Sequence, residues 1–351
     1  MSGGDLVERE WVHPTAGEEW WYVNGHLISD LGAKLSFVVC FFRQYLCLMI
    51  FDEQKDVCKV RILEGHSTRF DPMTRELRYG ESTWSLETRT VGGPAHHLEV
   101  YAKDVVLRVN LYPTKPPLVV GLLPLGLLGR VNYYAIVDLE CDGSIMIGEE
   151  SVSVKGRAWI DRMWGTWEPA GFARWEWISM LLNDGTPAVL FAVFHHLRRA
   201  VPILTILASQ LENGQKVTRG PVTIAHSKRW KSKESGIEYP LGWQISSEKD
   251  PRTCLVVEPK MDGQELHQYI WEGACSVSGT LDGRYVEGDA YAEIAYAVPQ
   301  TKPTALGLAL LFYAIIGTSC EESRDRQLGH SIGSPSVLAR SWAYYDNSSG
   351  C

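Results

Sequence analysis

The sequence predicts an all-β protein built from antiparallel sheets. Asp-Gly and Asn-Gly pairs, which favour tight hairpin turns, recur between short runs rich in Val, Ile, Trp and Tyr. One such turn is expected at Cys141-Asp142-Gly143, between strands at 135–139 and 144–147. Long stretches with a 3.6-residue period are nearly absent before residue 300. Because closed or sandwiched sheets hide strand edges, we expect β-barrels or curved sheets.

The length of the strand-rich region predicts two consecutive β-domains. It runs to about residue 300, which is more than one small barrel requires. We expect an N-terminal domain over residues 1–167 and a second domain over 168–300. Beyond Lys302 the composition changes to a short apolar run and then to a charged, Ser- and Gly-rich end. This change predicts a C-terminal appendage, residues 301–351, with a short apolar helix.

Composition and charge exclude several classes of protein. The 351 residues are 45% hydrophobic and 22% charged, as in an ordinary globular protein, and the formal net charge of −8 argues against nucleic acid as a partner. Eight scattered Cys without a Cys-x-x-Cys pair indicate reduced thiols, and adjacent His pairs point to opposite strand faces, so no metal site is predicted. No phosphate-binding glycine loop is present, so no nucleotide cofactor is expected. Without a visible secretory signal, we interpret the protein as cytoplasmic.

Two apolar segments bear on membrane contact. Leu118–Leu128 and Ala305–Ile316 are both shorter than the roughly 20 residues that span a bilayer. Each is expected to pack inside the protein, with a membrane-touching lip as the alternative. The Gly and Pro residues of the first segment would also suit a gate over a cavity.

The densest aromatic segment lies near the N-terminus, at Glu19–Leu27. Read as a strand, it places Trp20, Tyr22 and Asn24 on one face and Glu19 and Trp21 on the other. The first face combines rings with hydrogen-bonding tips, as a cavity wall would. The alternative is that the rings are core and the polar tips reach water.

A second segment, Val154–Trp167, presents a carboxyl group among apolar neighbours. Trp159, Asp161 and Met163 would share one strand face. If that face is buried, desolvation should raise the pKa of Asp161 and make it a candidate proton donor. The alternative is a structural role, in which Asp161 pairs with a neighbouring Arg or a backbone amide.

Two further aromatic pairs complete the set of candidates. Trp175 and Trp177 share a strand face and form an aromatic shelf, either as core or as a platform for an unsaturated ligand. Tyr133 and Tyr134 supply two phenols, which can donate hydrogen bonds to a carbonyl or a developing oxyanion.

Together these segments resemble the carotenoid 1,2-hydratase (hydroxyneurosporene synthase) and AttH family over about residues 10–297. The resemblance is collinear. It is carried by Glu19-Trp20-Trp21-Tyr22, Tyr133-Tyr134, Gly156-x-Ala158-Trp159-x-Asp161-Arg162-x-Trp164-Gly165, Trp175-x-Trp177, Tyr239-Pro240-Leu241-x-Trp243, Trp271-Glu272-Gly273 and the strand pair from Gly283 to Glu293.

The resemblance implies two lipocalin-like β-barrels or curved sheets, with a ligand cavity in or between them and no metal or organic cofactor. Family relatives include hydratases that protonate a carotenoid alkene and lipocalin-like cyclases that fold polyketide chains for ring closure, including Diels-Alder reactions. In the hydratases an Asp of the Trp/Tyr-x-Asp segment delivers the proton, and Asp161 matches it. The sequence Asn132-Tyr133-Tyr134, without an assisting His/Trp pair, departs from the hydratases and favours the cyclases.

We therefore expect a cofactor-independent cyclase, such as a Diels-Alderase, acting on a linear polyene or polyketide-type substrate in natural-product biosynthesis. The alternatives are a carotenoid or terpenoid hydratase or proton-initiated cyclase with Asp161 as the acid, and a non-catalytic carrier of a hydrophobic ligand. The expected partner is a hydrophobic small molecule, and the oligomeric state is open. The expected catalytic residues are Asp161, Tyr134 and Glu19; the expected substrate-binding residues are Trp20, Trp21, Tyr22, Asn24, Tyr133, Trp159, Trp164, Trp175 and Trp177.

Overall fold

The computed structural model describes residues 12–13, 15–87, 94–125, 129–167, 172–195, 202–267 and 269–296. All regular elements in these ranges are β-strands, which confirms the predicted fold class. No helix of the described residues is long and apolar enough to cross a membrane. The expected C-terminal appendage and its apolar helix lie outside the described residues.

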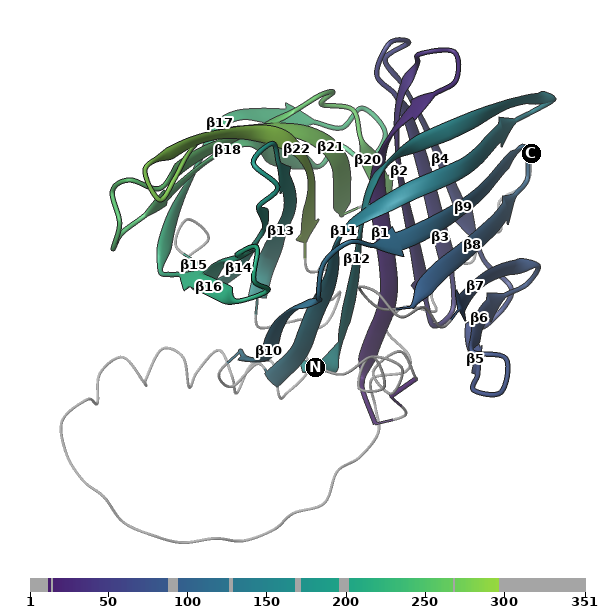
Figure 1. Cartoon of the computed structure of the whole chain (residues 1–351), viewed down its shortest axis with the longest axis horizontal. Coiled ribbons are helices and arrows are strands. Elements are labelled where there is room, and N and C mark those ends of the chain that lie inside the picture. The colour runs from purple at the N-terminus through teal and green to yellow at the C-terminus, as the bar shows by residue number, and fades with distance from the viewer. Residues whose placement is uncertain are drawn as a thin grey trace, which may run out of the picture. The chain divides into compact units, whose positions relative to one another are not determined.

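The first twelve strands form one antiparallel sheet, called sheet A (Figure 1). Its strand order is β4-β3-β2-β1-β12-β11-β9-β8-β7-β6-β5, with β10 paired to β11. The strands are β1 (Glu18–Ser29), β2 (Lys34–Phe42), β3 (Leu46–Asp52), β4 (Val57–Leu63), β5 (Arg69–Asp71), β6 (Glu76–Tyr79), β7 (Ser82–Glu87), β8 (Ala95–Ala102), β9 (Val105–Pro113), β10 (Leu118–Pro124), β11 (Gly129–Ile147) and β12 (Glu150–Trp167).

The remaining ten strands form a second antiparallel sheet, called sheet B. Its order is β16-β15-β14-β13-β22-β21-β19-β18-β17, with β20 paired to β21. The change of sheet falls between Trp167 and Phe172, and the division into domains at residues 1–167 and 168–300 stays a prediction. The strands are β13 (Phe172–Leu182), β14 (Pro187–His195), β15 (Pro202–Gln210), β16 (Lys216–Arg219), β17 (Val222–Lys231), β18 (Glu238–Ser247), β19 (Cys254–Pro259), β20 (Glu265–His267), β21 (Ile270–Leu281) and β22 (Arg284–Tyr296).

Of the five Asp-Gly and Asn-Gly pairs, four lie in connections between strands, and the fifth, Asp142-Gly143, lies within a strand. Asp282 and Gly283, for example, both take positive φ in the turn between β21 and β22, as a tight hairpin requires. The expected turn at Cys141-Asp142-Gly143 is wrong, because β11 continues through it to Ile147. A side chain on Gly143 would collide with the carbonyl of Arg108 on β9, so this glycine permits close strand approach instead of a turn.

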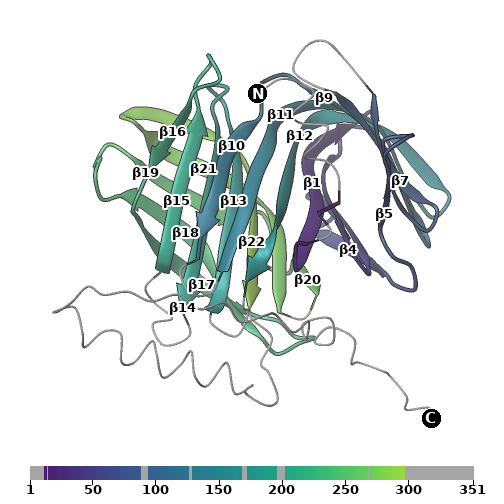
Figure 2. The same cartoon turned by 90° about the horizontal axis from the view of Figure 1, so that it is seen from below.

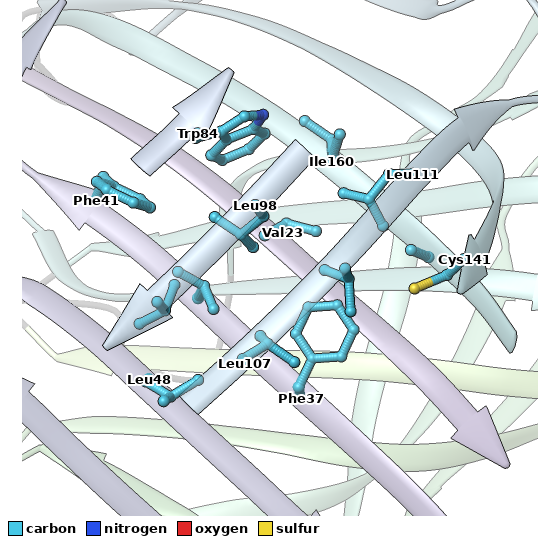
Figure 3. Packing of buried hydrophobic residues seen from close by; sticks show 14 of the residues in the cluster. Val23, Phe37, Phe41, Leu48, Trp84, Leu98, Leu107, Leu111, Cys141 and Ile160 are labelled. Atoms are coloured by element: carbon cyan, nitrogen blue, oxygen red, sulfur yellow. The ribbon is translucent and has the colours of Figure 1, made fainter. Parts of the chain in front are cut away.

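Apolar side chains fill the concave side of each sheet. In sheet A, Val23, Phe37 and Ile160 belong to a fully buried cluster that continues through β8 and β9 (Figure 3). In sheet B, Trp243 and Trp271 belong to an equivalent cluster. A third cluster lies between the two sheets, where β1, β11 and β12 lie against β13, β21 and β22 (Figure 1, Figure 2). Because side chains alternate along a strand, each of these central strands contributes residues both to the interior of its own sheet and to the layer between the sheets.

Candidate functional site

The layer between the sheets holds most of the residues that the sequence singles out. On β1, Trp20, Tyr22 and Asn24 face this layer, as the alternation predicts. Trp159, Asp161 and Met163 on β12 share the same face, because the register pairs Tyr22 with Asp161. From sheet B, β13 contributes Trp175 and Trp177, and from β11 comes Tyr133.

Asp161 is buried in this layer, with 4% of its surface exposed. Its Oδ1 atom has no hydrogen-bond partner among the described residues. The next residue, Arg162, points to the other face of β12 and forms its ion pair with Glu19 there, at 3.0 Å. Burial, together with the nearby Glu293 carboxyl, raises the pKa of Asp161 well above its usual range, although the charge of Arg162 opposes this. Its surroundings therefore favour the protonated form of Asp161.

Two glutamates of sheet B accompany Asp161. Glu272 on β21 and Glu293 on β22 are direct cross-strand neighbours. The Tyr22 hydroxyl donates to Glu272 Oε1 at 2.6 Å, and the Trp175 indole donates to Glu293 Oε1 at 2.5 Å. No Lys, Arg or His of the described residues forms an ion pair with any of these three carboxyl groups.

Burial also controls the protonation of the two glutamates. It raises the pKa of Glu293 to about 7, partly offset by the hydrogen bond from Trp175. Burial and the Glu293 carboxyl raise the pKa of Glu272 well above its usual range, against the hydrogen bond from Tyr22. The sequence reasoning included neither glutamate among the site residues. Both glutamates alternate with apolar residues on expected strands, and this pattern could have identified them. Glu272 also belongs to the family motif Trp271-Glu272-Gly273.

Aromatic rings and hydrogen bonds fix the position of this acidic group. The rings of Tyr22 and Trp177 meet edge to face, with their centroids 5.2 Å apart. The Trp177 indole donates to the Tyr133 hydroxyl at 3.0 Å, and the Asn24 amide donates to the hydroxyls of Tyr22 and Ser179, both at 3.4 Å. The polar groups of these side chains therefore form hydrogen bonds with one another between the sheets, and the alternative that they reach bulk water is wrong.

An apolar pocket lies one strand step from the carboxyl groups. Trp20 precedes Tyr22 by two residues on β1, and Met163 follows Asp161 by two on β12, so the pocket adjoins the acidic layer on the same faces. The Trp20 and Trp175 rings are nearly parallel, with centroids 6.5 Å apart. The pocket is small and partly open to solvent, and it is lined by Trp20, Leu125, Val131, Met163, Trp175, Phe191 and Val193.

Four expected site residues lie elsewhere. Trp21, Tyr134 and Trp164 pack with the interior of sheet A, on the opposite strand faces from Tyr22, Tyr133 and Asp161. Glu19 lies on that side too, where it is bound by His13 and Arg162. The structure therefore does not bring Glu19, Tyr134, Trp21 or Trp164 to the Asp161 layer.

The pairing of Glu19 gives it a different electrostatic character from Asp161. Burial acts to raise its pKa, but the hydrogen bond from His13 and the charge of Arg162 together hold the pKa below its usual value. Glu19 is thus a fixed negative charge. In the described part of the chain, no group of three or more His, Cys, Asp or Glu side chains is arranged to hold a metal ion.

Comparison with known proteins identifies the family. The profile of the AttH-like family matches residues 48–296, which is more than half of the chain. The chain belongs to the AttH-like family. The strands that carry Asp161, Glu272 and Glu293 all lie inside the matched region. No curated protein matches the sequence.

Solved structures share the fold of this AttH-like protein. A putative AttH from Nitrosomonas europaea is 24% identical, with a TM-score of 0.69, over 82% of this chain and 95% of that chain. Kievitone hydratase from Nectria haematococca is 14% identical, with the same TM-score, over 85% of this chain and 93% of that chain. A structure of CghA with Sch210972 is 10% identical, with a TM-score of 0.49, over 82% of this chain and 93% of that chain. The two closer likenesses establish the two-sheet, lipocalin-like fold.

Proposed function

We propose that this AttH-like protein is an enzyme that protonates a carbon–carbon double bond of a hydrophobic substrate, with Asp161 as the acid. One observation carries the proposal: Asp161 is a buried carboxyl group with an unpartnered oxygen, it forms no ion pair with any described residue, and it lies next to an apolar aromatic pocket. A carboxyl group kept neutral by its surroundings can donate a proton to a weakly basic carbon, which an ionised one cannot.

The rings around Asp161 suit the species that protonation produces. Adding a proton to an alkene leaves a positive charge on the neighbouring carbon. The faces of Trp and Tyr rings attract cations, and Trp20 and Trp175 are pocket walls that a substrate would contact. Aromatic walls therefore stabilise the charge until water or a second double bond captures it.

The fate of the cation decides between two reactions. Capture by water gives hydration, and capture by a second double bond of the same substrate gives proton-initiated cyclisation. The structural neighbour from Nectria haematococca is named as a hydratase, which supports hydration as the first reaction to test. Both reactions share the protonation step and the need for Asp161.

A pericyclic cyclase is the second candidate. The nearly parallel Trp20 and Trp175 rings and the wholly apolar lining of the pocket favour it, because such walls can hold a flexible polyene in a folded, reactive conformation. In that reaction no proton is added to carbon, so Asp161 would at most polarise a carbonyl group of the substrate.

The test begins with the compounds that the protein retains. Native mass spectrometry and extraction of the protein from its producing cells identify the ligand, which is then incubated with wild type and Asp161→Asn in D₂O. Asp30→Asn, in an exposed turn, is the matched control. We expect deuterium on a product carbon with wild type and the control, and loss of turnover by at least about 100-fold with retained binding in Asp161→Asn.

Two other results would contradict the proposal. An unlabelled cyclised product formed equally by wild type and Asp161→Asn would establish the pericyclic reaction. Recovery of the same unchanged ligand from both proteins would indicate a carrier.

A further inference from the structure

We propose that Glu293 is a second catalytic carboxyl group, which accepts a proton from water while Asp161 donates one to carbon. The inference rests on the proposed function and deepens it, because a site with both a proton donor and a proton acceptor is built to add water across a double bond. The two sheets place these two carboxyl groups at corresponding positions in the layer between them.

The two sheets place Asp161 and Glu293 in matching positions. In sheet A, Asp161 on β12 is the cross-strand neighbour of Tyr22 on β1. In sheet B, Glu293 on β22 is the cross-strand neighbour of Trp177 on β13. The Tyr22 and Trp177 rings are in contact, so each carboxyl group flanks one ring of the same pair. The match continues along the strands in the pairs Trp20–Met163 with Trp175–Ala295 and Asn24–Trp159 with Ser179–Tyr291.

Glu293 differs from Asp161 in its access to water. Asp161 is almost fully buried, whereas the Glu293 side chain retains part of its exposed surface. The Trp175 indole holds Glu293 by a hydrogen bond, and the Trp175 ring is itself a wall of the pocket. The hydrogen bond from Trp175 occupies Oε1 of Glu293, and a carboxylate has a second oxygen with which it can accept a hydrogen bond from water.

Electrostatic repulsion divides the protons unequally between the two groups. Neither carboxyl group has an ion-pair partner among the described residues, and the charge of Glu293 contributes to the raised pKa of Asp161. The pKa of Glu293 is about 7, and once Glu293 has lost its proton its negative charge favours retention of the proton on Asp161. The layer also holds the titratable groups of Tyr22, His26, Cys40, Tyr45, Cys47, Cys58, Tyr133, Glu272 and Tyr291, and near His26 the ion pairs of Lys260 with Glu53 and Asp289.

The proton balance of the reaction closes on this arrangement. Asp161 gives its proton to one alkene carbon and becomes a carboxylate. The oxygen of water bonds to the adjacent cationic carbon, and the proton released from that water goes to the Glu293 carboxylate. Transfer of this proton from Glu293 back to Asp161 restores both groups, so the net change is alkene plus water to alcohol. No oxidant, reductant or cofactor is required.

The pairing is testable without any substrate. Carboxyl ¹³C chemical shifts of protein labelled in Asp and Glu side chains are followed against pH in wild type, Glu293→Gln and Asp161→Asn. We expect the apparent pKa of Asp161 to fall by at least about one unit in Glu293→Gln, which removes the neighbouring negative charge. The pKa of Glu293 should stay near 7 in Asp161→Asn, because Asp161 is still uncharged while Glu293 titrates. Glu287→Gln, an exposed position on the same strand, should change neither. An Asp161 titration curve that superimposes in wild type and Glu293→Gln would overturn the pairing.

The catalytic role has its own readout, the pH profile of turnover. With the ligand identified as above, wild type should lose activity below about pH 7 as Glu293 becomes protonated. Glu293→Gln should lose turnover about 100-fold together with this acidic limb, and Glu293→Asp should restore part of both. An unchanged profile in Glu293→Gln, with Asp161→Asn inactive, would overturn the role of Glu293 and leave the proposed function intact. Coupled titrations without any Asp161-dependent turnover would overturn the proposed function and, with it, the catalytic role of Glu293, and would leave only the electrostatic pairing of the two groups.

Discussion

Buried carboxylates inside the two sheets differ from those between them. Inside sheet B, Glu176 is fully buried and accepts hydrogen bonds from Arg174 at 2.7 Å, from His226 at 3.0 Å and from Trp243 at 2.9 Å. Glu19 inside sheet A has an equivalent Arg and His environment. Burial acts to raise the pKa values of Glu19 and Glu176, but the hydrogen bonds and charges of these partners outweigh it. Both pKa values are therefore below their usual range.

Between the sheets the same burial has the opposite outcome. Asp161, Glu272 and Glu293 receive hydrogen bonds only from neutral groups or none, and their pKa values are raised. The hydrogen-bonding and charged partners of a buried carboxyl group, and not its depth of burial, therefore decide whether its pKa is lowered or raised. Glu19 and Glu176 are held as charges within ion pairs inside the sheets, whereas burial makes proton release from the three carboxyl groups between the sheets harder.

The strongest test of this contrast removes a fixed charge. Glu176→Gln leaves Arg174 buried without its anion, so we expect a loss of about 3–5 kcal/mol in the free energy of unfolding. Urea denaturation at pH 7 measures it, with the exposed Glu287→Gln as control. A loss below about 1 kcal/mol would show that the ion pair does not brace sheet B.

Removal of Glu293, a carboxyl group with a raised pKa, should change how the free energy of unfolding depends on pH. A carboxyl group whose pKa rises from 4.5 to about 7 on folding binds protons more tightly in the folded state. Its contribution to the free energy of unfolding therefore falls by about 3 kcal/mol as the pH rises from 4.5 to 7, and is then constant. In Glu293→Gln this part of the pH dependence should vanish. Parallel stability curves for the variant and wild type from pH 4.5 to 8 would contradict it.

The Tyr22 hydroxyl is the donor to Glu272, so Tyr22→Phe removes one buried hydrogen bond and keeps the ring. We expect a loss of about 1 kcal/mol, because a buried acceptor loses its partner. The same change should raise the pKa of Glu272 further, since the hydrogen bond lowers it. Thermal denaturation and carboxyl NMR report the two effects. A stabilised variant with an unshifted Glu272 would refute the contact.

The smallest expected effect concerns Trp175. Trp175→Phe keeps an aromatic pocket wall and removes the indole donor to Glu293. Because that hydrogen bond lowers the pKa of Glu293, its loss should move the pKa above about 7, by up to about one unit. A downward movement of the Glu293 titration would show that the bond does not favour the ionised form.

Strand alternation explains how much of this site the sequence could predict. The face shared by Trp20 and Tyr22, and that shared by Trp159 and Asp161, follow from a period of two and need no knowledge of partners. The same rule correctly separated Glu19 from Trp20. The sequence could not show that the cavity side of these strands is the layer between the sheets, because that depends on which sheet face the other sheet covers.

The remaining differences have similar physical causes. Tyr133 and Tyr134 are equally aromatic neighbours, and only the register of β11 against β12 decides that Tyr133 faces the Asp161 side. Glu272 and Glu293 come from strands more than 100 residues away in sequence, and only the pairing of β21 with β22 and the packing of the sheets bring them to Asp161. Likewise, Asp142-Gly143 is a turn by composition but a strand by its contacts with β9.

The infrared spectrum of the carboxyl groups tests the central claim most directly. The difference between wild type and Asp161→Asn is recorded at pH 7, with ¹³C labelling of Asp side chains to separate them from Glu. The account predicts that wild type shows a labelled carbonyl band of a protonated carboxylic acid, which the variant lacks. A difference confined to the bands of ionised carboxylate would show that Asp161 carries no proton at neutral pH, and would contradict its role as the acid.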